Sequence, residues 1–130
     1  MLDAGAYCRS LILAQPGVAG PIGARCYERS LPESASLPAV VYDMSGGTGE
    51  TEPGYQWRTF EVICWAATRD GAVALYGALS DALHADGADQ QTAGGEVLSG
   101  IEEVGGGVPD MDPETEYHYV RTTIRFLMAT

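Results

Sequence analysis

The stretch 31-LPESASLPAVVYDM-44 decides how this chain is read. Pro32 and Pro38 each fix the backbone φ at about −65° and push the preceding residue into extended geometry. The run Ala39–Tyr42 that follows is apolar and made of residues that favour strands. The stretch therefore predicts a rigid loop that leads into a buried β-strand, and it contains no pattern of catalytic residues.

Composition indicates one domain over residues 1–130 and excludes some functions. The chain has 130 residues, of which 45% are hydrophobic, enough for one core. Seven Arg and no Lys stand against 18 Asp plus Glu, so the formal net charge is −11. Direct binding of nucleic-acid phosphates is not expected, because it needs a basic face. The acidity either keeps the protein soluble or makes a surface that DNA passes without adhering.

Cysteine usage and hydropathy argue against a secreted protein and against a membrane protein. Cys8, Cys26 and Cys64 are odd in number and widely spaced, so reduced, buried thiols are expected rather than a disulfide framework. No stretch approaches the roughly 20 apolar residues that a membrane-spanning helix needs. The first residues carry Asp3 and lack the pattern of a signal peptide. No membrane association is predicted.

Helical periodicity predicts a first helix near the N-terminus. Apolar residues recur from Ala4 to Ile12 at the spacing of one buried helix face. Asp3 is its expected N-cap, and Pro16-Gly17 is its expected stop. The segment Gly17–Gly23 is then expected to be a connector.

A second helix is predicted after the middle of the chain. Its apolar stripe runs from Ala72 to Leu83, and Thr68 stands where an N-cap is needed. Asp86-Gly87 is its expected end.

Four further segments alternate or cluster as strands do. Besides the strand that begins at Ala39, the expected strands are Ala24–Arg29, Tyr55–Ala66, Glu96–Val104 and one that begins at Tyr117. Gly46–Gly54 is expected to be a long polar hairpin loop, and Gly105–Gly107 a break. The order of elements lacks a repeating βαβ unit. It predicts an α+β domain, with a mainly antiparallel sheet of four to five strands and two helices packed on one face.

Alternate residues of one acidic segment resemble the start of a calcium loop. An EF-hand is excluded, because Thr115 replaces the required Gly and Arg121 replaces the bidentate Glu. A looser divalent-ion site would make the chain a small metal-dependent hydrolase, and the simpler interpretation is a solvated acidic turn. The four carboxylates are those of Asp110, Asp112, Glu114 and Glu116.

Other catalytic patterns are missing from the sequence. His84 and His118 are not at ligand spacing with a Cys or with each other. Cys64 lies in an apolar strand, where burial makes a thiol inert. Glu102 and Glu103 are adjacent in a strand and point to opposite faces, so they cannot act as a paired acid and base. The prediction is no catalytic residue, no bound metal and no cofactor.

Three motifs in order resemble the tail-terminator, or tail-completion, proteins of long-tailed bacteriophages. The first joins an Arg-x-Tyr to the opening stretch, in which Glu33 stands where the pattern more often has Gln. The second is a strand ending in Trp65-Ala66 before an Ala- and Leu-rich helix. The third is the turn Asp112-x-Glu114-Thr115 before the strand that contains Tyr119-x-Arg121. The motif positions assigned a structural role are Arg25, Tyr27, Leu31, Pro32, Leu37, Pro38, Trp65 and Arg121.

The resemblance implies a structural protein with no turnover. It implies a ring of six subunits that caps the tail tube, stops the addition of major tail tube protein and meets a head-completion protein of the neck. It further implies that duplex DNA passes through the hole without specific binding. The expected location is the head-tail junction of the virion, with assembly in the host cytoplasm. A head-to-tail adaptor, or stopper, of the neck is the alternative within the same class.

Two sets of residues are candidates for these contacts. The hairpin after the first long strand is the candidate for reaching a neighbouring subunit or the tube. The acidic segment described above, from Asp110 to Glu116, is the candidate for lining the hole. The hairpin set is Gly46, Gly47, Thr48, Glu50, Glu52, Gly54, Tyr55 and Trp57.

Overall fold

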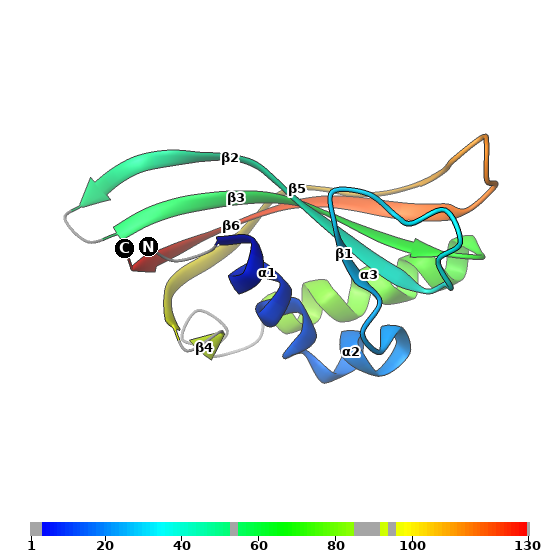
Figure 1. Cartoon of the computed structure of the whole chain (residues 1–130), viewed down its shortest axis with the longest axis horizontal. Helices are drawn as coiled ribbons and strands as arrows, with labels where there is room; N and C mark the ends of the chain where they lie inside the picture. Colours follow the sequence, from blue (N-terminus) through cyan, green and yellow to red (C-terminus); the bar gives the residue numbers. More distant parts are fainter. Residues whose placement is uncertain (1–3, 53–54, 85–91, 94–95, 130) are drawn as a thin grey trace.

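The computed structural model of the chain describes residues 4–52, 55–84, 92–93 and 96–129. The helices are α1 (Ala4–Leu13), α2 (Pro16–Ile22) and α3 (Arg69–Leu83). The strands are β1 (Cys26–Glu28), β2 (Ala39–Glu52), β3 (Tyr55–Ala66), β4 (Thr92–Ala93), β5 (Glu96–Met111) and β6 (His118–Ala129). The three helices lie on the same side of the sheet (Figure 1).

The strands form a mixed sheet in the order β1-β2-β3-β6-β5-β4. β1 runs parallel to β2, whereas the other neighbouring strands are antiparallel. Because β4 has only two residues, five strands make up the body of the sheet. The α+β class is confirmed. The predictions of a mainly antiparallel sheet and of two helices are corrected to a mixed sheet and three helices in the described residues.

The extra helix is α2, which occupies the segment expected to be a connector. Pro16 suits its first position, because a proline there has its φ already set and its missing N–H has no intrahelical partner to lose. Val18 and Ile22 are four residues apart and fully buried, so they anchor α2 to the core. Gly23, with φ 61°, ends the helix.

Two aromatic rings at the centre of the sheet face the helices. Phe60 on β3 and Phe126 on β6 stack with their ring centroids 5.5 Å apart, and Tyr7 of α1 packs 5.3 Å from Phe126. Leu75 and Leu79 add the apolar stripe of α3 to the same cluster. Each such side chain contributes about 1.5–3 kcal/mol of burial free energy, so this layer is the main source of stability.

Both glycine-rich segments belong to strands, which corrects the sequence prediction. The residues from Gly46 to Glu52 continue β2 and pair with β3, although the register shifts between Met44 and Gly46 and twice more before Glu52. Gly54 lies outside the described residues. The ladder with β3 supplies partners for backbone groups whatever the side chain, so pairing overrides the low strand propensity of glycine.

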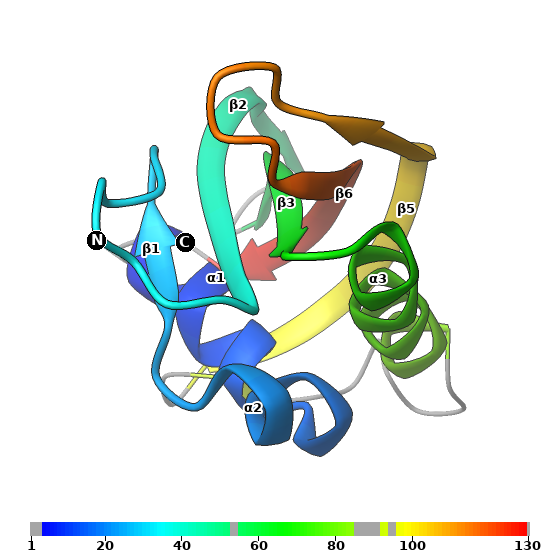
Figure 2. The ribbon, with the colours of Figure 1, turned by 90° about the vertical axis from the view of Figure 1, so that its right-hand side faces the viewer.

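β5 likewise continues through the expected break at Gly105–Gly107 and ends at Met111. Its register against β6 shifts at three places, between Leu98 and Gly100, Glu103 and Gly105, and Gly106 and Val108. Gly106 and Gly107 have φ values of 101° and 90°, which favour glycine strongly. These bulges bend β5 across α3, as Figure 2 shows.

Local signals for α3 are confirmed. Thr68 is the N-cap, and its hydroxyl accepts a hydrogen bond from the Gly71 N–H at 3.0 Å. The caps predicted at Asp3 and at Asp86-Gly87 lie outside the described residues.

Replacing Gly106 by Ala tests the need for the bulge. A Cβ atom there would lie 2.3 Å from the Arg121 carbonyl oxygen and 2.6 Å from the Thr122 Cα. Because the clash is with backbone and φ is positive, we expect Gly106→Ala to lower the free energy of unfolding by more than about 2 kcal/mol in urea titrations. The matched control is Gly105→Ala, where a Cβ meets nothing within 4 Å. A control that is equally destabilised would show that the glycine run is generally intolerant and that the bulge is not the reason.

Candidate functional site

The side of the sheet away from the helices carries an ordered set of charges and rings. Arg121 on β6 forms an ion pair with Glu61 on β3, with 3.0 Å between Nε and Oε1. Arg125 pairs with Glu102 of β5, and its guanidinium carbon lies 4.5 Å from the centre of the Trp57 ring. Arg125 therefore joins β5 to β3 across β6 by an ion pair and a cation–π contact. We call this side the open face.

The open face continues with two further aromatic side chains. Trp65 and Tyr119 pack with ring centroids 4.9 Å apart, and the Tyr119 hydroxyl donates a 3.3 Å hydrogen bond to Asp110. The indole N–H of Trp65 is buried and has no hydrogen-bond partner among the described residues. A hollow of about 280 Å³ opens beside these side chains, lined by Gly106, Val108, Asp110, Tyr119, Arg121 and Thr123. Two predicted motif positions, Trp65 and Arg121, thus lie on the open face.

Another pair of motif positions, Arg25 and Pro38, meets at the loop before β2. Arg25 donates hydrogen bonds to the carbonyl oxygens of Pro38 and Pro21, both at 2.9 Å, and so ties the loop before β2 to α2. Leu37 and Pro38 are joined by a cis peptide bond. Tyr27 pairs in register with Val41. The remaining motif positions, Leu31 and Pro32, lie on the loop between β1 and β2.

An apolar hollow of about 370 Å³ lies beside this junction. It is enclosed by α2, the loop before β2, the end of β3 and the first turns of α3. Its lining is apolar apart from Thr68. The lining residues are Gly17, Pro21, Leu37, Pro38, Ala66, Ala67, Thr68, Gly71, Ala74 and Leu75.

The acidic segment forms the turn between β5 and β6. Asp112 organises it, because its two carboxylate oxygens accept hydrogen bonds from the Glu114 N–H at 3.1 Å and the Thr115 hydroxyl at 3.0 Å. Asp110 caps its neighbour by accepting from the Met111 N–H. Glu114 and Glu116 point into solvent. In the part of the chain that the structure describes, no three His, Cys, Asp or Glu side chains gather as a metal site would need.

The hairpin candidates lie at the other end of the sheet. The backbone of Gly46, Gly47, Thr48, Glu50 and Glu52 belongs to β2, and Tyr55 and Trp57 begin β3. Trp57 is half-buried beneath the Arg125 guanidinium. The structure thus brings the hairpin set and the acidic set to opposite ends of the long strands.

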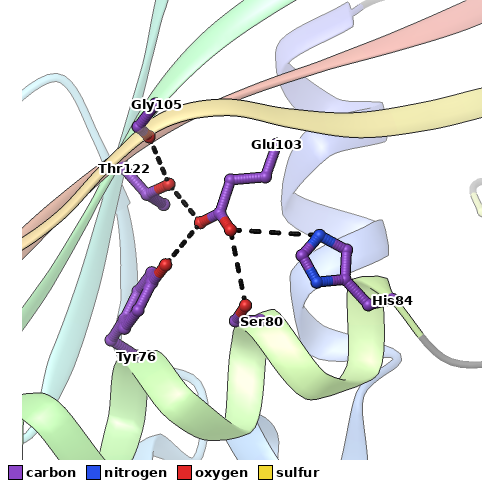
Figure 3. A network of polar contacts seen from close by, with 6 residues as sticks. All are labelled: Tyr76, Ser80, His84, Glu103, Gly105 and Thr122. Carbon is purple, nitrogen blue, oxygen red and sulfur yellow. Dashed lines mark hydrogen bonds and ion pairs between the residues drawn. The ribbon is translucent and has the colours of Figure 1, made fainter.

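Sequence reasoning missed a polar network between α3 and the sheet, drawn in Figure 3. Glu103 turns its carboxylate towards α3 and accepts hydrogen bonds from the Tyr76 hydroxyl at 2.8 Å and the Thr122 hydroxyl at 2.5 Å. The Ser80 hydroxyl lies 3.4 Å and the His84 Nε2 3.9 Å from its other oxygen. Burial, followed by the hydrogen bond to Glu103, raises the pKa of Tyr76 above its usual value.

This network fastens β5 to α3. Ser80 and His84 both face the carboxylate of Glu103 and not each other. A signal was present in the sequence. Tyr76, Ser80 and His84 recur every four residues and so make one polar stripe along α3. Glu102 and Glu103 do point to opposite faces, as predicted.

The thiols are buried and reduced, as expected from the sequence. Cys8, Cys26 and Cys64 are all free. Burial is the main reason why the pKa of Cys64 rises from 9.0 to about 12 and that of Cys26 to about 11. A protonated, inaccessible thiol is a poor nucleophile. No helix in the described residues has both the length and the apolar character needed to cross a membrane.

A comparison with protein families identifies the fold's relatives. A family model described as bacteriophage tail terminator protein matches residues 10–105, more than half of the chain. The chain belongs to this family. The resemblance seen in the sequence motifs is therefore confirmed, and the protein is a phage tail structural protein by family. No curated protein matches the sequence.

A solved structure shows the same fold as this tail terminator family member. It is a chain from the virion of a native gene transfer agent particle, with a TM-score of 0.69 and 19% sequence identity. The similarity covers 98% of this chain and 97% of that chain. At this identity the likeness establishes the fold alone.

Substitution of Glu103 tests whether the network holds the tail terminator together. Glu103→Gln replaces one acceptor oxygen by an NH2 group that faces hydroxyl donors. We expect the free energy of unfolding to fall by about 1–3 kcal/mol in urea titrations. The control is Glu102→Gln, which removes an exposed ion pair of the same strand and should cost less than about 1 kcal/mol. Equal effects of the two substitutions would contradict a structural role special to Glu103.

The buried thiols predict a loss of stability at high pH. In the unfolded chain Cys64 and Cys26 ionise near 9.0, whereas the folded protein keeps their protons until about 12 and 11. Their contribution to stability is complete below pH 9.0 and disappears as pH rises through the folded pKa values. Urea titrations between pH 8 and about 11 should show this fall. Cys64→Ala should give a shallower slope, and an unchanged slope would contradict the assignment.

Proposed function

We propose that this tail terminator forms a ring of six subunits that caps the tail tube and ends its growth. The family membership of residues 10–105 is the observation that carries the proposal. In this proposal one side of the ring binds the last layer of major tail tube protein. The other side binds a head-completion protein of the neck. The ring would lie at the head-tail junction of the virion after assembly in the host cytoplasm.

The two flanks of the sheet support a closed, head-to-tail assembly. On one flank β1 covers only the first residues of β2, up to Tyr42. On the other flank β4 covers β5 only at Glu96 and Val97. The rest of both strands has no further strand beside it in the described residues. The flanks differ in sequence, and a ring requires two different surfaces on each subunit that fit one another.

The charge of the subunit suits a passage for DNA. Six copies of a chain with formal net charge −11 would surround the hole with negative potential, so duplex DNA would pass without adhering. The candidates for the lining remain the carboxylates from Asp110 to Glu116. The hairpin of β2 and β3, with Tyr55 and Trp57, remains the candidate for contact with the tube. Both assignments are proposals from the sequence.

Tube assembly tests the proposed function. Tube protein polymerised alone should give tubes of widely spread length, whereas addition of this protein during growth should arrest elongation and leave a capped end. Electron microscopy of length distributions measures the arrest, and labelled protein should sit at one end. A heat-unfolded sample is the control for non-specific effects. Tubes that keep growing in its presence contradict the proposal, and binding to portal-side proteins without binding to tube ends indicates the adaptor instead.

A further inference from the structure

One subunit carries both halves of an apolar contact. The exposed large apolar side chains of the described residues, apart from Val73, all lie on the two flanking strands: Met44 on β2 and Val104, Val108 and Met111 on β5. Val108 is 73% exposed and Met111 is 46% exposed, and both lie next to the acidic turn. We call Val108, Met111 and this turn the knob. Burial of such side chains against a partner would be favourable.

The apolar hollow beside α2 is the matching feature. Its volume of about 370 Å³ is enough for a Val or Met side chain, and Leu37, Ala74 and Leu75 are among the apolar groups that line it. Figure 2 shows the β5–β6 turn and α2 at opposite margins of the molecule when it is viewed along its long axis. The hollow and the knob lie at the same end of the sheet, because the lining residue Ala66 pairs with His118 and His118 pairs with Met111 of the knob.

Charges around the two features are complementary. The knob carries the carboxylates of Asp110, Asp112, Glu114 and Glu116. The hollow is flanked by Arg69, which stands between the lining residues Thr68 and Gly71, and by Arg25, whose guanidinium is bonded to the lining residues Pro21 and Pro38. Neither arginine belongs to an ion pair within the described residues. Asp70 beside Arg69 offsets part of this charge, so the apolar contact provides most of the attraction and the charges orient it.

We propose that the knob of one subunit inserts into the hollow of a second copy of this chain. The contact is heterologous, because the two surfaces are different, so its repetition produces a ring when the rotation closes. This inference rests on the proposed function, since it supplies the subunit contact of that ring. It also removes the carboxylates from Asp110 to Glu116 from the lining of the hole. These carboxylates lie either at the subunit contact or in the lining of the hole, and the cross-linking experiment below separates the two placements.

Engineered disulfides test the contact in the full chain. The native thiols are buried, so they do not compete with the new thiols for cross-linking. Val108→Cys and Ala74→Cys place one new thiol in the knob and one in the hollow, both at exposed positions. On tube ends, after mild oxidation, either single variant should give no cross-link. A mixture of the two should give dimers only, and the double variant should give a ladder that ends at the full ring. Non-reducing gels measure each product.

Val73→Cys is the matched control for the hollow, because Val73 is exposed and next to Ala74 but does not line the hollow. Combined with Val108→Cys, it should give no ladder. Cross-linking of Val108→Cys alone would overturn the proposal in favour of a symmetric contact. Capped tubes on which the double variant forms no ladder would also overturn it, while the proposed function would stand. Failure of the unmodified protein to cap tubes would remove the proposed function and this contact together.

The dependence of association on salt offers a second measurement, which needs no cross-linking. Six subunits of formal net charge −11 repel one another at low ionic strength, whereas the apolar insertion is not weakened by salt. Sedimentation at increasing salt should show association, and Val108→Asp should reduce it at least tenfold relative to Val73→Asp. Equal association of these two variants would contradict insertion of Val108.

Discussion

The antiparallel ladder between β3 and β6 is the constraint on which the rest of the structure depends. It runs from the pair Tyr55 and Ala129 to the pair Ala66 and His118 with no shift in register. Because side chains alternate along a strand, this single register sends Phe60 and its neighbours to the helices and sends Trp57 and its neighbours to the open face. A slip of one residue would exchange the two sets. Both the core and the charged outer surface therefore follow from one set of backbone pairs.

Much of this arrangement could be predicted from local patterns. The strand expected from Tyr117 onwards is β6, in which Val120, Ile124 and Phe126 are buried and Arg121 and Arg125 are on the open face. The stripe and the cap of α3 were also correct. In these segments propensity, periodicity and capping all favour the same structure, and such agreement makes a local prediction reliable. The family resemblance rested on motifs in these same parts of the chain.

The errors occurred where distant parts of the chain decide the local conformation. The segment from Gly17 to Gly23 has few helix formers, and it is helical because Val18 and Ile22 are buried in the core. Glycine-rich parts of β2 and β5 are strands because β3 and β6 lie beside them and supply hydrogen-bond partners. The tie between Glu103 and α3 depends on the bulges that aim the side chain. The polar stripe of α3 is visible in the sequence, but no local pattern shows that Glu103 meets it.

The irregularity of β5 has a consequence for how subunits can meet. Its ladder with β6 shifts register at three places, so the strand is kinked, and Pro109 has no N–H to donate. A long regular border would recruit one chain after another into a fibre, a serious hazard for molecules gathered at high local concentration on a growing particle. An irregular border disfavours that route, so the proposed ring contact would rest on side chains of defined shape. A contact that closes into a ring is finite, so in the proposed assembly the same kinks that shape the subunit also guard the particle against runaway polymerisation.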